Sequence, residues 1–384
     1  MDLADLISLR KDLHAHPEVK FEEFRTADRV AEILSSFGYR PSRGLAKTGV
    51  IASLHGKKPG PSILFRADMD ALPIEERGDH AHISRHVGRM HACGHDGHTT
   101  MLLGAAAVLA LDPPECGTVH FVFQPGEEGG AGAKVMLDEG LLEQFPADRV
   151  FGMHNWPGLP IGAMATRAGA IMAGGWRFLI TITGQGSHAA QPHLGRDALT
   201  IGAAFVQEAQ LLISRRSDPM EPAVLSICTF HSGTTDNILP ETATLRGTIR
   251  SLDVQELEAL KRGMTRLAEG LAHTHEVTIA IEFYQPYPVT VNTTDEMALA
   301  LSAMRSAVGA QGTVISNMKP SMASEDFGFM LQKRPGTFVM LGNGSSAPLH
   351  SPDYDFDDTI IPQGIAYWVA LAHACLRTNK DTEL

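Results

Sequence analysis

The sequence has little cysteine and no excess of positive charge. Its 384 residues include only Cys93, Cys116, Cys228 and Cys375, which are too scattered for the disulfide framework of a small secreted domain. Lysine and arginine number 32 against 44 aspartates and glutamates, which gives a net charge of −12. This balance argues against nucleic acid or an anionic membrane as the main partner. We therefore expect a protein with reduced thiols.

Long hydrophobic runs are also missing. No segment approaches the ~18 consecutive apolar residues of a membrane span. The first residues, MDLADLISLRKDLHAHPE, lack the basic and apolar regions of a secretory signal peptide. We expect a cytoplasmic protein without a membrane partner, with a mature secreted form as the alternative. A chain of 384 residues exceeds the usual size of a single core, so two domains are expected.

What the sequence does contain, in its first part, is an alternation of strand and helix patterns. Apolar periodicity predicts strands at 49–56, 62–70, 117–124 and 149–156, and helices at 3–18, 24–38, 98–112 and 133–142. This alternation is typical of an α/β domain with a mostly parallel sheet and flanking helices. The segment 98–112 is apolar on nearly every side, which predicts a buried helix with Asp96 or Thr99 as its cap.

The middle of the chain has a different pattern. Residues 176–290 follow the order β-α-β-β-α-β, which is typical of a small α+β sandwich. Helical patterns at 295–309 and 364–377 then resume the α/β pattern. We therefore predict one domain formed by 1–175 and 291–384, with 176–290 inserted into it.

Polar side chains follow three of the predicted strands. Asp68 and Asp70 end the strand at 62–70, Glu127 and Glu128 follow the strand ending at 124, and His154 lies at the end of 149–156. Ligands of open α/β sheets bind outside the carboxyl ends of strands. These side chains are therefore candidates for one shared site.

The stretch RMHACGHDGHTT, residues 89–100, concentrates one cysteine among three histidines. Cys93 and His95 are candidate metal ligands, but Cys93 could also be a small buried hydrophobic residue or a nucleophile with a histidine partner. A structural zinc finger does not fit, because no second C-x-x-C or H-x₃-H half follows.

The adjacent carboxylates Glu127 and Glu128, flanked by glycines, favour the metal interpretation over a solvated loop. One carboxylate could bind a metal while the other serves as a general base. With His154 and His350 they complete a set of sulfur, nitrogen and oxygen donors that Zn²⁺, Mn²⁺, Co²⁺ or Ni²⁺ accept. The set exceeds what one tetrahedral ion needs, whereas two ions that share a bridging ligand would use all of it.

The chain resembles the aminoacylase and hippurate hydrolase family of binuclear metallopeptidases. The resemblance runs along essentially the whole chain, through LRKDLHAHPEVKFEE, FRADMDALPI, MHACGHDGHT, FQPGEEGGAGAKVM, GSHAAQPH, TDNILPETATLRGTIRS, SMASEDFG and PLHSPDYDF. It implies a zinc-peptidase-like catalytic domain with an inserted dimerisation domain. It also implies that two divalent ions are bound by Cys93, His95, Glu128, His154 and His350, with Glu127 as the catalytic base.

One position differs from sister branches of that family. They place a metal-binding histidine where this chain has Arg66, and a guanidinium cannot bind a metal. The resemblance therefore implies that Cys93 bridges the two ions. Asp68 and Asp96 are expected to support the ligands from behind, and Asp96 is alternatively a helix cap.

In the inserted domain the resemblance assigns roles to three further residues. His188 is expected to stabilise a developing oxyanion in the partner subunit's site, and Asn237 and Arg250 to hold the substrate carboxylate. The predicted assembly is a homodimer or homotetramer formed through 176–290.

The resulting expectation is a metal-dependent amidohydrolase that cleaves small N-acyl amino acids, such as hippurate or N-acetyl amino acids. Two alternatives remain open: a thiol amidase with Cys93 as nucleophile, and a metal- or ligand-binding protein without turnover. The histidine-rich stretch ERGDHAHISRHVGRM, residues 76–90, could shape substrate access, but a solvated loop is the expected interpretation.

Overall fold

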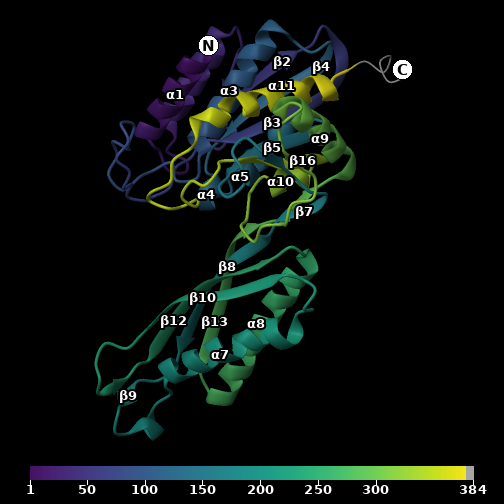
Figure 1. Ribbon diagram of the computed structural model, residues 1–384. Coiled ribbons are helices and arrows are strands. Elements are labelled where there is room, and N and C mark those ends of the chain that lie inside the picture. Colours follow the sequence, from purple (N-terminus) through teal and green to yellow (C-terminus); the bar gives the residue numbers. More distant parts are fainter. Residues whose placement is uncertain (378–384) are drawn as a thin grey trace. The chain divides into compact units, whose positions relative to one another are not determined.

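The computed structural model describes residues 1–377, which divide into two compact units. The first unit comprises Met1–Ile171, Thr290–Lys319 and the described chain from Asp326 onward, and the second comprises Met172–Val289 with Pro320–Glu325. Figure 1 shows both units in ribbon form. Among the described residues, no helix has the length and apolar character needed to cross a bilayer.

The first unit is built on an eight-stranded sheet, with strand order β1-β2-β4-β3-β5-β16-β6-β15. Its strands are β1 (Ser42–Arg43), β2 (Val50–His55), β3 (Lys58–Asp68), β4 (Cys116–Gln124), β5 (Arg149–Trp156), β6 (Met164–Ala165), β15 (Val314–Ile315) and β16 (Gly336–Gly342). The central strands β4, β3, β5 and β16 are parallel to one another, whereas β2 and β6 run antiparallel to their central neighbours. The predicted α/β fold with a mostly parallel sheet is confirmed.

The helices of the first unit are α1 (Leu3–Ala15), α2 (Phe24–Ser36), α3 (His95–Leu111), α4 (Glu127–Gly130), α5 (Gly132–Asp138), α6 (Leu141–Gln144), α9 (Thr294–Val308), α10 (Gly328–Leu331), α11 (Ile361–Cys375) and the 3₁₀ helix η2 (Asp358–Ile360). A short pair of strands, β7 (Gly169–Met172) and β14 (Thr290–Asn292), accompanies them. Helix α3 contacts α1, α11 and β3 (Figure 1). It is buried on nearly every side, as its apolar sequence predicts.

The core of this unit lies between the sheet and the helices α3 and α11. Phe65 of β3 is fully buried, and its ring centroid lies 4.7 Å from that of Trp368 on α11 and about 6 Å from those of its sheet neighbours Phe121 (6.3 Å) and Phe151 (6.1 Å). Burying an aromatic side chain of this size stabilises the fold by roughly 1.5–3 kcal/mol.

Strand β16 was not predicted from the sequence. All of its residues are buried, and it pairs with β5 on one side and β6 on the other. Such strands have a continuous apolar pattern without alternation, which a short window cannot separate from a buried helical segment. Its parallel pairing with β5 brings the chain that leads to His350 to the carboxyl end of the sheet.

The second unit contains a four-stranded antiparallel sheet in the order β10-β12-β8-β13. Its elements are β8 (Gly174–Thr183), β9 (Ser187–His188), η1 (Pro192–Leu194), α7 (Ala198–Arg216), β10 (Ala223–Ser232), β11 (Ile238–Leu239), β12 (Thr242–Ser251), α8 (Val254–His275) and β13 (Thr278–Tyr287). Both helices pack on the sheet, and the alternating buried residues of β8 and β12 form the covered face. Strands β9 and β11 form a separate two-stranded ribbon.

Candidate metal centre

The candidate ligands of the first unit gather at the carboxyl ends of its parallel strands. Donor atoms of Cys93, Glu128 and His350 lie within 4.8 Å of one another, as do those of His95, Glu127 and Glu128. The Cys93 Sγ atom lies 3.4 Å from His154 Nε2, which links the fifth predicted ligand to the group. Residues more than 250 positions apart in the sequence therefore meet at one place.

Helix α3 starts at this place because of a glycine. Gly94 precedes it with φ +86°, a left-handed conformation that side chains other than glycine rarely adopt. A Cβ atom at Gly94 would also lie 2.4 Å from Asn155 Oδ1 and 2.7 Å from the Tyr354 hydroxyl. The glycine thus allows close packing where Cys93 and His95 enter the site. Neither Asp96 nor Thr99 caps this helix with its side chain, so that prediction was wrong.

The rings of His95 and His154 are held in defined orientations by backbone carbonyls. His95 Nδ1 donates to the Asp70 carbonyl at 2.8 Å, and His154 Nδ1 donates to the Asn155 carbonyl at 2.6 Å. In each ring this arrangement leaves the Nε2 lone pair for a ligand. The buried His95 Nε2 has no hydrogen-bond partner within residues 1–377, which is the condition expected of an atom that binds a cation.

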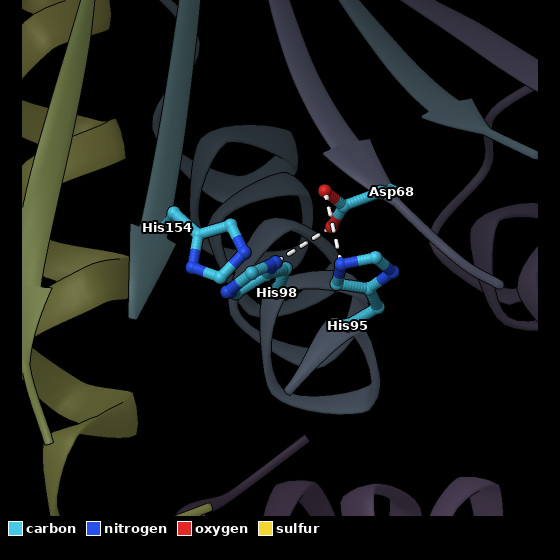
Figure 2. Close-up of side chains that lie close together, drawn as sticks. All are labelled: Asp68, His95, His98 and His154. Atoms are coloured by element: carbon cyan, nitrogen blue, oxygen red, sulfur yellow. Dashed lines mark hydrogen bonds and ion pairs between the residues drawn. The ribbon is translucent and has the colours of Figure 1, made fainter. Parts of the chain in front are cut away.

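Asp68 lies at the end of β3 and connects two of the histidines (Figure 2). Its Oδ1 accepts from His98 Nδ1 at 2.6 Å, and its Oδ2 lies 3.5 Å from His95 Nε2. His98 Nε2 in turn accepts from the backbone N–H of Asn155 at 2.9 Å. Because both nitrogens of His98 are used within the protein, His98 positions Asp68 and β5 and is not free to bind an ion.

Arg66 occupies the buried position directly behind Asp68. It donates to Asp68 Oδ2 at 2.7 Å, to Asp326 Oδ1 at 2.8 Å and to Gln124 Oε1 at 2.7 Å. Burial alone would raise the pKa of Asp68, but the Arg66 guanidinium and the neighbouring histidines hold it well below its usual range. Asp68 is therefore a fixed negative charge facing His95.

The Glu127–Glu128 turn is fastened by two carboxylates that the sequence interpretation did not assign to this role. Asp70 accepts from the backbone N–H of Glu127 at 2.9 Å and from that of Glu128 at 2.8 Å. Glu23 Oε1 accepts from the backbone N–H of Gly126 at 2.9 Å. The aspartate after the strand at 62–70 was a visible signal for Asp70, whereas no local pattern points to Glu23.

The electrostatic field of the site attracts positive charge. Burial lowers the pKa of His95, but Asp68, Asp70 and Glu128 outweigh it and raise that pKa to about 10. Burial, then the carboxylates of Glu128 and Glu127, raise the pKa of the Cys93 thiol well above its usual range. A site that holds protons this strongly, with thiol, imidazole and carboxylate donors converging, suits a divalent metal ion.

Asp96 lies beside the candidate ligands, but its side chain contacts residues of helix α1. Its Oδ2 accepts from His14 Nδ1 at 2.8 Å and lies 3.7 Å from Arg10, while its Oδ1 accepts from the Gly97 N–H at 2.9 Å. These contacts connect Asp96 to α1. That Asp96 supports a metal ligand stays a prediction.

The candidate residues of the second unit fall into two places. His188 in β9 pairs with Ile238 of β11, next to Asn237, and both His188 and Asn237 are exposed. Arg250 lies on β12 opposite Gly175, where its Nη1 donates to the Met322 carbonyl and to Ser324 Oγ, at 3.2 and 2.7 Å. Within this unit, the structure brings His188 and Asn237 together but not Arg250.

An α/β sheet with a thiol, imidazole and carboxylate cluster at its carboxyl edge is typical of a protein that binds divalent metal ions. Residues 64–374 match the model of peptidase family M20/M25/M40, and the chain belongs to that family. It is therefore a hydrolase that acts on amide bonds.

Two relatives and one solved structure illustrate the match. The chain is 38% identical to thermostable carboxypeptidase 1 of Saccharolobus solfataricus, over 97% of this chain and 94% of that protein. It is 35% identical to the hippurate hydrolase of Campylobacter jejuni, over 95% and 94%. A crystal structure described as a dinuclear metal-binding M20 peptidase of Bacillus subtilis superposes with a TM-score of 0.81 at 32% identity, covering 97% of this chain and 98% of that one.

Proposed function

We propose that this protein is a metal-dependent amidohydrolase that cleaves N-acyl amino acids to a carboxylic acid and a free amino acid. The observation that carries the proposal is the Glu127–Glu128 turn. Glu128 lies with Cys93 and His350, while Glu127, about nine-tenths buried, lies beside it with His95. This arrangement puts one carboxylate among the donors and leaves its neighbour to handle protons.

Cys93, His95, Glu128, His154 and His350 would hold two divalent ions. Zn²⁺, Mn²⁺, Co²⁺ and Ni²⁺ all accept this donor set. Bound there, such ions would supply Lewis acidity and lower the pKa of water toward neutrality. The solved dinuclear relative supports the number two.

Glu127 is the proposed general base and later the general acid. Its carboxylate takes a proton from the attacking water and returns it to the nitrogen of the leaving amino acid. Because Asp70 accepts hydrogen bonds from the backbone N–H groups of both glutamates, the backbone that carries the Glu127 side chain is held in place. General acid–base catalysis of this kind contributes typically about 10²–10⁴-fold to the rate.

The alternative with Cys93 as nucleophile is disfavoured by its surroundings. A nucleophilic cysteine needs a lowered pKa. Here burial and two carboxylates raise the pKa of Cys93, so the free thiol stays protonated at neutral pH. Beside a cation the same thiol would ionise and serve as a ligand.

His188, Asn237 and Arg250 are proposed to act on the substrate. His188 would donate a hydrogen bond to the oxyanion, and Asn237 and Arg250 would hold the carboxylate of the amino acid. The exposed ribbon that carries His188 and Asn237 supports a role toward a partner subunit, in a homodimer or homotetramer formed through 176–290. Location in the cytoplasm stays a prediction.

Metal-reconstituted hydrolysis tests the proposal. The protein is stripped with a chelator, each of the four divalent ions is added back, and amine release is followed on N-benzoylglycine and several N-acetyl amino acids. We expect activity that disappears on stripping and returns with metal. Activity that is indifferent to chelation would move the chemistry to Cys93, and tight metal binding without turnover on any substrate would support a binding protein instead.

A further inference from the structure

The segment that joins helices α1 and α2 contacts the turn that carries Glu127 and Glu128. In this segment the Glu22 backbone N–H donates to the Val19 carbonyl at 2.9 Å, which closes a tight turn. Phe21 is the third residue of that tight turn, and its φ is +60°. A bulky residue rarely adopts this left-handed conformation, which favours glycine. Strained backbone of this kind persists only where neighbouring contacts hold it, and it is most frequent at functional sites.

The Phe21 ring lies against two glycines of the turn formed by residues 126–130. A Cβ atom at Gly126 would lie 2.7 Å from Phe21 Cε1, and one at Gly130 would lie 2.8 Å from Phe21 Cε2. Gly126 has a φ of +66°, which by itself favours glycine. Gly130 has no positive φ, so its backbone does not require glycine, and the nearest obstacle to a side chain there is the Phe21 ring. The ring and the turn therefore fit each other closely.

Polar groups of the same segment also bind the backbone of this turn. Lys20 Nζ donates to the Gly129 carbonyl at 3.1 Å. Glu23 Oε1 accepts from the backbone N–H groups of Phe21 and Gly126, both at 2.9 Å. One carboxylate oxygen thus ties the strained residue to the first residue of the turn. The ring, the ammonium group and the carboxylate therefore all contact one short stretch of backbone.

The turn needs such contacts because of its composition. Three of its five residues are glycines, and glycine has the greatest backbone freedom of all residues. The hydrogen bonds to Asp70 hold only the two central N–H groups, those of Glu127 and Glu128. The glycines on either side have no side chain that could anchor them, so a rigid neighbour must hold them. The Phe21 ring is that neighbour, because it lies against one glycine before Glu127 and another after Glu128.

We propose that Phe21 is a positioning residue for Glu127, a role that rests on the proposed function of Glu127 as general base. The ring acts through the backbone of the turn and does not contact the reacting atoms. A carboxylate can take a proton from water and return it to nitrogen only within hydrogen-bond reach of both. A displacement of about 1 Å can lower the rate by about 10²-fold. Loss of the ring should therefore slow the chemical step and leave substrate binding unchanged.

Steady-state kinetics of the full-length protein, with metal in excess, tests the proposal. We expect Phe21→Ala to lower kcat by about 10–100-fold with an unchanged KM. The matched control is Phe24→Ala, because Phe24 lies three residues further along the chain and its side chain is 58% exposed. This control should keep the wild-type kcat. A wild-type kcat in Phe21→Ala, a change confined to KM, or an equal loss in both variants would overturn the proposal.

A double-mutant cycle with Gly130 separates contact with the turn from a general loss of folding. Gly130→Ala alone puts a Cβ atom against the Phe21 ring and should lower kcat. In the Phe21→Ala background the same substitution should cost little, because the nearest remaining atom, Lys20 Cδ, would lie 3.5 Å away. Residues in contact show a coupling of about 2–150-fold in such a cycle. Losses of kcat that simply multiply would contradict the contact between ring and turn.

Hydrogen exchange followed by mass spectrometry gives a readout that needs no turnover. The peptide that spans 125–131 contains the N–H groups that donate to Asp70 and Glu23. In Phe21→Ala its exchange curve should shift to shorter times, while Phe24→Ala and the other peptides of the first unit should match wild type. Unchanged exchange of this peptide in Phe21→Ala would overturn the proposal. Faster exchange in Phe21→Ala, together with a wild type that hydrolyses no N-acyl amino acid, would count against the proposed function alone.

Discussion

The two units present their candidate residues in opposite ways. In the first unit Cys93, His95, Glu127 and His154 are buried, and Asp70, far away in sequence, accepts hydrogen bonds from the His95 ring and from the Glu127 backbone N–H. In the second unit His188 is exposed, and the hydrogen bond at its ring is a local one from the Ala190 N–H. A buried residue takes part in both stability and chemistry, whereas an exposed one can be changed with little effect on the fold. The two units should therefore respond differently to mutation.

The largest expected loss of activity follows from a change at Glu127, which tests the role of the buried unit most directly. Glu127→Gln preserves the shape but removes the proton acceptor, so kcat/KM should fall by about 10⁴-fold at the upper end of general base catalysis. Steady-state kinetics measures this, with metal content as the control, because Glu127 is not a proposed ligand. Wild-type turnover with full metal content would show that Glu127 is not the base.

His188→Ala sharpens the contrast. Loss of an oxyanion donor should lower kcat by about 10²–10³-fold, while the unfolding free energy should change by less than about 0.5 kcal/mol because the side chain is exposed. His193→Ala, at an equally exposed position in η1, is the matched control and should leave both quantities unchanged. Equal activities of the two variants would remove His188 from the mechanism.

Glu23 provides a pH test of the buried unit. Burial, then the Asp70 carboxylate, raise the pKa of Glu23 to about 7, above the 4.5 of an ordinary glutamate. The folded protein therefore binds a proton that the unfolded chain releases between pH 4.5 and 7. Stability from this group is present below pH 4.5 and is lost as pH rises through 7, by up to about 3 kcal/mol.

The measurement for Glu23 is urea unfolding of wild type and Glu23→Gln at pH 5 and pH 8. The wild type should lose stability between the two pH values relative to the variant, whose side chain does not titrate. Parallel changes in both proteins would contradict the assignment. The candidate residues of the second unit provide no comparable buried carboxylate.

A substitution of Asp70 should lower turnover least among these variants. It should, however, change activity, metal affinity and stability together. Asp70→Ala leaves the backbone N–H groups of Glu127 and Glu128 without their acceptor. Support of this kind is worth about 10–100-fold in metal affinity or activity, and each unpaired buried N–H costs about 1–3 kcal/mol of stability. Metal titration, kinetics and urea unfolding measure metal affinity, activity and stability.

The control is Asp79→Ala, because Asp79 is exposed in the neighbouring loop. If Asp70→Ala loses stability but keeps its metal affinity, the role of Asp70 is structural only.

The sequence by itself determined the alternation of strands and helices and the placement of Asp68, Glu127, Glu128 and His154 at strand ends. Apolar periodicity reports which face of an element is buried, and the edge at which parallel strands end follows from their direction. The motif around Cys93 also identified the family. These features are local or follow a regular period, so they can be seen without coordinates.

Only the tertiary structure decided which groups hold the site in place. It placed β16 beside β5, and it placed Glu23 and Asp70 where they accept hydrogen bonds from the backbone of the Glu127–Glu128 turn. It also packed the His80 ring against His14 of α1, although a solvated loop was expected there. The partners of a buried polar group must satisfy its hydrogen bonds and charge, and the chain supplies them from wherever the packing brings it. That choice depends on contacts between residues far apart in sequence, which leave no periodic trace.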